Sequence, residues 1–526
     1  MIKLIAQSII ELFLKLFNFL STKRVDKIKH KPTSYALDLP GNKNQFDLKE
    51  NTHPDQSGFY LLESNIDAFT ARCNLINHSL HSLDLQYYYF HGDTSGKLIA
   101  QSLIKAADRG IRIRVLLDDI DTLGADEAIS ILNAHPSVEI RIFNPFNFRG
   151  LLRYFEFIVD LSRVGRRMHN KAIIADNIQA IIGGRNISDV YFSADPELLF
   201  LDVDLLSKGN IVKKVSKSFD EYWNSRWAVP VALLYDRPKR DYALKKIKTF
   251  LQKHAYEIKQ IDYAQYAQDS ELAQEEFFFN LPFVWSQADL FYDHPSKINP
   301  EVTSDEKTLH ISQVKSKLHD IFSMATEELT IVSPYFVPGD DGVKWFETLV
   351  AQGVKVNVFT NSLAATDVTA VHAGYARYRA QLLAAGINLY ELKASAYVKE
   401  RKRFKILKTG SRTSLHAKTV IVDQSKVFMG SPNLDPRSTD LNTEMGLFID
   451  SKELANQFVN LFTGISSGHN SYRLTLKKNT RTGKHGITWN CQEDGVSTEY
   501  DSDPETGWFR KLKVRFFSLL PLENLL

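Results

Sequence analysis

Two stretches of this sequence decide its organisation: MHNKAIIADNIQAIIGGRN at residues 168–186 and LHAKTVIVDQSKVFMGSPN at residues 415–433. Both follow the pattern H-x-K-x4-D-x6-G-[GS]-x-N without a gap. One such match could arise by chance, but two with the same spacing indicate a duplicated unit. The shared chemical positions are His169, Lys171, Asp176 and Asn186 in the first copy, and His416, Lys418, Asp423 and Asn433 in the second.

The segments upstream of each stretch repeat the same order of elements. Apolar periodicity and turn residues predict strands at 82–90, 111–119, 328–336 and 354–362, and helices at 95–110 and 342–353. The turn glycines Gly110 and Gly353 are 243 positions apart. This βαβ order, used twice, predicts an α/β fold of two fused repeats, each a mostly parallel sheet flanked by helices.

Length and composition agree with two globular units. A chain of 526 residues is too long for one ordinary core, and 44% apolar with 24% charged residues excludes a mainly disordered chain. The formal net charge of +3 gives no global field for nucleic acid. Two cysteines, Cys73 and Cys491, exclude a disulfide scaffold and a thiolate zinc site.

Composition shifts along the chain suggest six segments. We expect a membrane-interface segment at 1–31, a polar linker at 32–56, the first repeat at 57–230, a helical charged insertion at 231–300, the second repeat at 301–465 and a C-terminal extension at 466–526.

Both ends of the chain have features of membrane-surface helices. The first twenty residues, MIKLIAQSIIELFLKLFNFL, place their polar positions within an arc of about 140°, and the basic stretch TKRVDKIKHK follows. The C-terminal stretch GWFRKLKVRFFSLLPLENLL mixes aromatic and cationic residues. No run of eighteen uncharged apolar residues occurs, so a transmembrane helix is not favoured. The alternatives are a first helix docked on the protein's own surface and a core-packed last helix.

The chemistry of the repeated pattern suits phosphate. On an extended segment, a His and a Lys two residues apart point to one side, and an Asn amide with turn N–H groups can complete an anion site. Two histidines brought together can divide the work, one attacking phosphorus and the other protonating the leaving alcohol. Each histidine is followed by a lysine, whose charge disfavours a neighbouring dication, so we expect no metal and no cofactor.

This constellation resembles the phospholipase D superfamily, whose signature is a duplicated His-x-Lys-x4-Asp motif. The resemblance implies an active site between the halves, a phosphohistidine intermediate, and lysines and asparagines that hold the phosphoryl oxygens. It assigns His169 as nucleophile and His416 as general acid and base by analogy, although the residues themselves do not distinguish them. It also implies structural roles for the motif aspartates.

In that family an acidic residue on the next strand orients each histidine. Here Glu444 follows His416 by 28 residues, and strand alignment makes Asp202 its counterpart, with Asp204 as a rival. Basic residues also precede both histidines: Arg163, Arg166 and Arg167 in the first repeat, and Lys399, Arg401, Lys402, Arg403, Lys405, Lys408 and Arg412 in the second. We expect these clusters to contact lipid or phosphate.

Several stretches resemble bacterial cardiolipin synthases of the type C branch, including GSPNLDPRSTDLNTEMG, FVWSQADLFYDHPSK and the ending SLLPLENLL. This resemblance implies transfer of a phosphatidyl group from phosphatidylethanolamine or phosphatidylglycerol to phosphatidylglycerol, at the bacterial inner membrane. It leaves open the donor, the membrane leaflet, the oligomeric state and the need for a companion protein. The alternatives are a hydrolytic phospholipase D and, more remotely, a phosphodiesterase or nuclease, although no nucleic-acid partner is expected.

Overall fold

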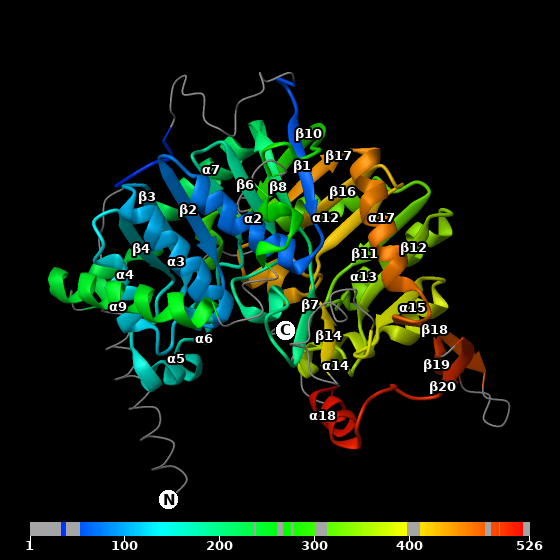
Figure 1. Ribbon diagram of the computed structural model, residues 1–526. Helices are drawn as coiled ribbons and strands as arrows, with labels where there is room; N and C mark the ends of the chain where they lie inside the picture. The colour runs from blue at the N-terminus through cyan, green and yellow to red at the C-terminus, as the bar shows by residue number, and fades with distance from the viewer. Residues whose placement is uncertain are drawn as a thin grey trace, which may run out of the picture.

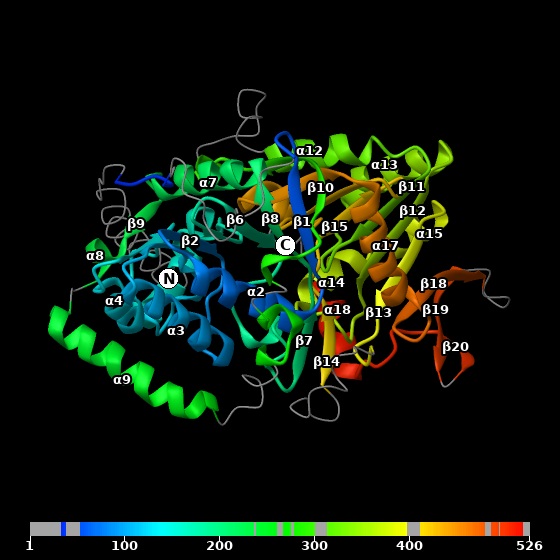
Figure 2. The same ribbon diagram turned by 45° about the horizontal axis from the view of Figure 1, so that its top comes forward.

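A long sheet runs through both halves of the chain. The computed structural model describes residues 33–37, 53–235, 238–259, 267–274, 278–299, 313–396, 411–478, 485–493 and 495–518, and within them 18 strands form one continuous sheet. Its order is β9-β4-β3-β2-β5-β6-β8-β1 in the first half, followed by β10-β17-β16-β15-β11-β12-β13-β18-β19-β20 in the second. Figures 1 and 2 show the two halves side by side, with β1 and β10 between them.

The first half contains the following strands and helices in chain order: β1 (Ser57–Leu62), α2 (Asn65–His78), β2 (Ser82–Tyr87), α3 (Thr94–Asp108), β3 (Arg112–Asp118), α4 (Asp126–Asn133), β4 (Val138–Phe143), α5 (Arg153–Val159), α6 (Leu161–Val164), β5 (Ala172–Ala175), β6 (Gln179–Gly183), β7 (Leu198–Leu201), β8 (Asp204–Gly209), α7 (Asn210–Trp223), β9 (Ala228–Pro230), α8 (Val231–Leu234) and α9 (Arg240–Lys259).

The second half contains β10 (Val284–Tyr292), α12 (Gln313–Phe322), β11 (Glu328–Val332), α13 (Gly339–Ala351), β12 (Lys355–Asn361), α14 (Thr369–Ala376), α15 (Arg379–Ala384), β13 (Asn388–Leu392), β14 (Arg412–Leu415), β15 (Thr419–Val422), β16 (Lys426–Gly430), β17 (Met445–Asp450), α17 (Lys452–Ser466), β18 (Ser471–Lys478), β19 (His485–Glu493), β20 (Val496–Tyr500) and α18 (Trp508–Ser518). The predicted α/β fold with two repeats is confirmed.

The sheet is mixed, so the expectation of mostly parallel pairing is wrong. Within the large sheet, parallel pairs occur only among β2, β3 and β4 and among β11, β12 and β13, where helices make the crossovers. The motif strands instead form antiparallel hairpins, β5 with β6 and β15 with β16, because only a tight turn separates them. Asp176 and Asn177 make the first turn with φ of 54° and 57°.

The range 231–300, expected to be a helical insertion, contains the helix α9 but also a strand in the second half of the sheet. β10 pairs antiparallel with β17 along six residues and with β1 along three. β10 therefore holds the place in the second repeat that β1 holds beside β8 in the first. The alternating pattern of VWSQADLFY fits this edge-to-edge junction, since one side of the strand packs inward.

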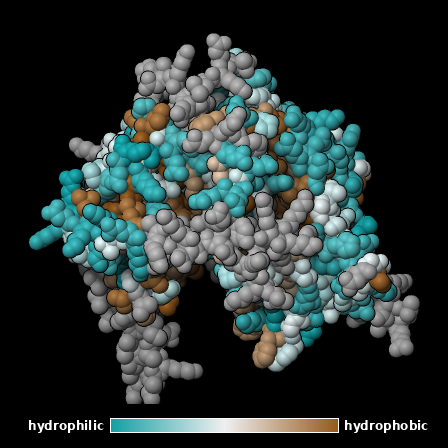
Figure 3. Space-filling model, in the orientation of Figure 1, coloured by the Kyte–Doolittle hydropathy of each residue, from teal (hydrophilic) through white to brown (hydrophobic). Residues whose placement is uncertain are grey.

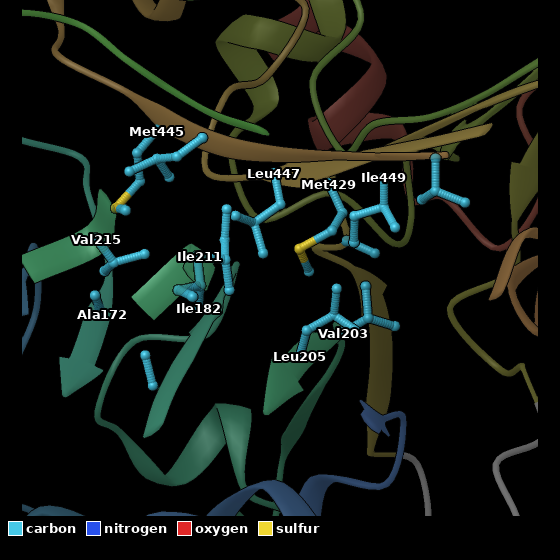
Figure 4. Packing of buried hydrophobic residues seen from close by; sticks show 14 of the residues in the cluster. Ala172, Ile182, Val203, Leu205, Ile211, Val215, Met429, Met445, Leu447 and Ile449 are labelled. Atoms are coloured by element: carbon cyan, nitrogen blue, oxygen red, sulfur yellow. The ribbon is translucent and has the colours of Figure 1, made fainter. Parts of the chain in front are cut away.

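The two repeats meet through a shared apolar core. Ile182 and Leu205 in the first half of the sheet and Val215 of α7 lie in one buried cluster with Met429 and Leu447 in the second half. Figure 4 shows these side chains pointing toward one another from the two halves. This packing places the ends of the motif strands of both repeats at one interface.

The predicted N-terminal segment, 1–31, and most of the linker lie outside the described residues. The C-terminal helix α18 is described, and none of its residues is buried, so it is not a core-packed helix. Among the residues that the structure describes, no helix has both the length and the apolar character needed to cross a bilayer.

Candidate active site

Each motif histidine is anchored to a strand or strand end of the opposite repeat. Met168 forms a parallel bridge with Thr443, and the His169 backbone N–H donates to the Thr443 carbonyl at 2.9 Å. In the second repeat, β14 pairs in parallel with β7, and the His416 N–H donates to the Leu201 carbonyl at 2.7 Å. The chain immediately before each histidine therefore crosses the interface.

This crossing decides which carboxylate contacts which histidine. His169 Nδ1 lies 2.9 Å from Glu444 Oε2, and His416 Nδ1 lies 2.5 Å from Asp202 Oδ2. The expected acidic residues are both present, but each serves the histidine of the other repeat, not the histidine before it in sequence. Asp204, the rival to Asp202, instead forms ion pairs with two buried arginines, Arg72 and Arg185.

The small residues of the G-[GS] pair make room for these carboxylates. A Cβ on Gly184 would lie 2.3 Å from Asp202 Oδ1, and a Cβ on Gly183 would lie 2.7 Å from the Asp204 Cα. In the second repeat, Ser431 replaces Gly184, and its hydroxyl donates to Glu444. The second residue of the G-[GS] pair therefore either leaves space for the carboxylate that orients the histidine or donates a hydrogen bond to it.

Two ammonium groups lie in the same buried site. Burial lowers the pKa of Lys171 to about 7, and Glu444 opposes this shift while Lys418 reinforces it. Burial also lowers the pKa of Lys418 to about 8, against the attraction of Asp202 and Glu444. Lys418 Nζ lies 3.1 Å from His416 Nε2. Because Glu444 and Asp202 each bond the histidine of the other repeat, the two motifs share one site.

Burial keeps both imidazoles neutral. It lowers the pKa of His169 to about 4, although the Glu444 carboxylate opposes it, and lowers the pKa of His416 to about 3, with Lys418 reinforcing. Burial alone would raise the pKa of Asp202, but its pairing with His416 lowers it, and the positive charges of Lys418 and Arg185 reinforce the lowering. An Nδ1–H that donates to a carboxylate leaves Nε2 with a free lone pair.

The two motif asparagines differ in their contacts. The Asn186 side chain accepts from the Tyr89 N–H at 3.2 Å and donates to the Tyr191 hydroxyl at 3.0 Å. The buried Asn433 side-chain oxygen has no hydrogen-bond partner among the described residues. Because an amide can be placed either way round, Asn433 can offer its NH2 group to an anion.

The motif aspartates lie at the far ends of β5 and β15 from the histidines. Asp176 accepts three backbone N–H bonds, from Leu80, His81 and Ser82. Asp423 does the same for Thr326, Glu327 and Glu328. Each carboxylate therefore fixes the start of the neighbouring strand, and neither contacts a motif histidine.

Sequence reasoning missed the aromatic side chains around the histidines. The Tyr88 ring packs edge-on against His169, with centroids 4.9 Å apart, and Tyr191 does the same to His416 at 5.0 Å. The Tyr191 hydroxyl lies 3.3 Å from His416 Nε2, and the Phe200 ring, which also contacts Tyr191, stacks on that imidazole. For Tyr88, the run of aromatic residues at 87–90 was the signal in the sequence that could have identified it.

Two of the three arginines before His169 are held by carboxylates within the first repeat. Arg163 pairs with Glu156 and Asp160, and the fully buried Arg167 contacts Asp118. The half-buried Arg166 donates to backbone carbonyls, including that of Lys297. Contact of this cluster with lipid or phosphate stays a prediction. Of the second cluster, only Arg412 lies within the described residues.

The sequence is similar to those of known proteins. The family model described as "Cardiolipin synthase, PLD-like domain" matches residues 73–223 and 318–465, one match for each repeat. The cardiolipin synthase C of Escherichia coli strain K12 is 39% identical over 90% of this chain and 97% of its own length. The major cardiolipin synthase of Bacillus subtilis strain 168 is 22% identical over 75% of this chain and 66% of its own.

A solved structure shows the same fold. The phosphatidylserine synthase of Haemophilus influenzae Rd KW20 superimposes with a TM-score of 0.54 at 13% identity, covering 92% of this chain and all of that one. Together with the family match to both repeats, these relatives decide the assignment. The chain belongs to the cardiolipin synthase family of the phospholipase D superfamily and is a phospholipase D-type phosphatidyltransferase.

Proposed function

We propose that this enzyme makes cardiolipin by transferring a phosphatidyl group to phosphatidylglycerol through a phosphohistidine intermediate. The observation that carries the proposal is the pair of buried neutral imidazoles, each bonded through Nδ1 to a carboxylate of the other repeat, beside two buried ammonium groups. This arrangement supplies a nucleophile, a second imidazole that can take up and release a proton, and positive charge for a phosphodiester at one place.

In the first step, His169 Nε2 attacks the phosphorus of the donor and the bond to the headgroup oxygen breaks. His169 is assigned as nucleophile because no described residue forms a hydrogen bond with its Nε2, whereas His416 Nε2 contacts Lys418 and Tyr191. His416, protonated in the complex with the anionic lipid, gives its proton to the leaving alcohol. The ammonium groups stabilise the developing negative charge on the phosphoryl oxygens.

In the second step, the glycerol hydroxyl of phosphatidylglycerol takes the place of the departed headgroup. His416, now neutral, removes the hydroxyl proton as the oxygen attacks phosphorus and the bond to His169 breaks. Phosphatidylethanolamine as donor would release ethanolamine, and phosphatidylglycerol would release glycerol. Only 8% of His169 and 6% of His416 is exposed, which limits water and favours transfer over hydrolysis.

We further propose that the enzyme works on the surface of the bacterial inner membrane. The exposed side chains of α5 and its flanks are apolar, with Ile158 72% exposed, and α18 exposes Trp508 and Phe509 beside Lys513 and Arg515. Both helices lie along the lower edge of the molecule in Figure 1, and Figure 3 shows apolar side chains on both. Aromatic and cationic helices of this kind favour the headgroup region of anionic bilayers.

The test is a lipid product assay by mass spectrometry with purified protein. Phosphatidylglycerol is supplied with and without phosphatidylethanolamine, to wild type and to His169→Ala and His416→Ala. Cardiolipin that forms with wild type and is lost in both variants supports the proposal, and its dependence on phosphatidylethanolamine identifies the donor. Phosphatidic acid as the only product would instead establish a hydrolytic phospholipase D, and no product from any mixture would direct the next assay to other phosphodiesters.

A further inference from the structure

The first repeat contains an apolar cavity of about 520 Å³ between its sheet and the helices α3, α4 and α9. Ile113 and Val115 of β3 and Ile140 of β4 form its floor, while Leu132 of α4 and Phe250 of α9 form part of its wall. Figure 3 shows apolar side chains between hydrophilic ones over the region of α3 and α4. This size lies within the range of about 300–1,000 Å³ that is typical of ligand sites.

Small side chains create this space, and the duplication provides an internal comparison. The helices α3 and α13 end at equivalent glycines, so Ala100 corresponds to Val343 and Leu103 to Phe346. In the second repeat, the Phe346 ring packs against Phe336 with centroids 5.9 Å apart. The space between this helix and the sheet is therefore filled by larger side chains in the second repeat and contains the cavity in the first.

The cavity reaches the candidate active site at Tyr88. This residue lines the cavity, and its ring packs edge-on against His169, with centroids 4.9 Å apart. The carboxylate of Asp118, also in the lining, is already bonded to the Met168 N–H at 2.8 Å. The other charged lining groups lie toward the surface: Lys97, Glu127 and Lys246 are exposed. The Asp121 carboxylate is paired with His91 at 2.8 Å. The deep part of the cavity, along β3 and β4, therefore offers hydrocarbon contacts.

We propose that this cavity binds an acyl chain of the donor phospholipid while its phosphorus lies at His169; this rests on the proposed function. An unbranched hydrocarbon chain fits an apolar space that begins at Tyr88, the residue packed against His169, and continues under α9. The enzyme therefore recognises the donor by its chain as well as its phosphate. A phospholipid and a free fatty acid share this chemistry, so the experiment includes both.

The first measurement compares dioleoyl and dihexanoyl phosphatidylglycerol as substrates in the same detergent micelles. The variant Ala100→Val with Leu103→Phe copies the second repeat into the cavity. We expect it to lower the ratio of kcat/KM for the long-chain over the short-chain lipid at least tenfold. The control, Ala351→Phe at the exposed end of α13, keeps the ratio. An unchanged ratio in the folded cavity variant would overturn the proposal.

The second measurement does not need turnover. Phosphatidylglycerol with a diazirine in one acyl chain is photolysed with wild type, and the labelled peptides are identified by mass spectrometry. Label within 97–132 or 246–250 supports the cavity, even if no cardiolipin forms, whereas label only elsewhere overturns it. A diazirine fatty acid is the second arm. If only the free acid labels the cavity, the donor is not its ligand and the proposal is wrong.

Discussion

Replacing Asp202 by Asn tests the crossed pairing between the repeats. The carboxylate lies 2.5 Å from His416 Nδ1 and is fully buried, so Asn keeps the shape but removes the charge. Hydrogen bonds to charged groups contribute about 1.5–3 kcal/mol. If that interaction acts fully in the transition state, turnover falls by about 10- to 150-fold.

The pH dependence of the same variant has a definite sign. The negative charge of Asp202 raises the pKa of His416, opposing the lowering caused by burial and by Lys418. Removing that charge lowers the pKa of His416 further, so less imidazolium is present at any given pH. Because His416 is proposed to donate a proton to the leaving group, the optimum of the Asp202→Asn variant shifts toward acid.

The matched control is Asp204→Asn, two residues along the chain. Asp204 pairs with the buried Arg72 and Arg185 at 2.9 and 3.2 Å and does not contact His416. Breaking such a pair lowers the free energy of unfolding by about 3–5 kcal/mol, while turnover per folded molecule is kept. The assay measures cardiolipin formation against pH and urea unfolding for both variants. Wild-type turnover in Asp202→Asn with lost turnover in Asp204→Asn would refute the assignment.

Three further predictions concern single residues. Gly184→Ala puts a Cβ 2.3 Å from Asp202 Oδ1 and so lowers turnover as Asp202→Asn does, measured by the same lipid assay; wild-type turnover would contradict it. Asp423→Asn weakens three backbone hydrogen bonds and lowers the free energy of unfolding by about 1–3 kcal/mol in urea, with turnover of the folded enzyme unchanged. The third concerns His372, which is buried with a pKa of about 4 and accepts a bond from Arg379. Since unfolded His372 binds a proton below about 6.5 and the folded residue does not until about 4, acidification through that window destabilises the protein by about 1.4 kcal/mol per pH unit. His372→Asn makes the plot of unfolding free energy against pH less steep, and an unchanged slope would contradict the assignment.

Local pattern was enough to predict the repeated elements. The helix expected at 95–110 is observed at Thr94–Asp108, and the strand expected at 354–362 at Lys355–Asn361, because apolar periodicity and the turn glycines act within a few residues. The structural role implied for Asp176 and Asp423 also agrees with their backbone contacts. These features depend only on neighbouring segments of chain.

The crossed carboxylates could not be predicted in the same way. His169 and Glu444 are 275 residues apart in sequence, and they meet because Met168 bridges Thr443 at the interface. The short parallel pair of β7 with β14 has the same effect on Asp202 and His416. Nothing in the local pattern distinguishes an acid that serves its own repeat from one that serves the other.

The crossing explains why two halves of one chain can differ in detail and still share a site. Each histidine contacts a carboxylate from the other repeat, so the site needs both repeats. Each residue at the interface, however, has to fit only its own partner. Gly184 with Asp202 and Ser431 with Glu444 are two solutions to the same requirement. Because the two repeats are fused in one chain, the helix layers on their outer faces need not carry the same side chains. The layer between α3 and the sheet can then be hollow while the corresponding layer around Phe346 is filled, so the acyl-chain site that we propose in the first repeat needs no counterpart in the second.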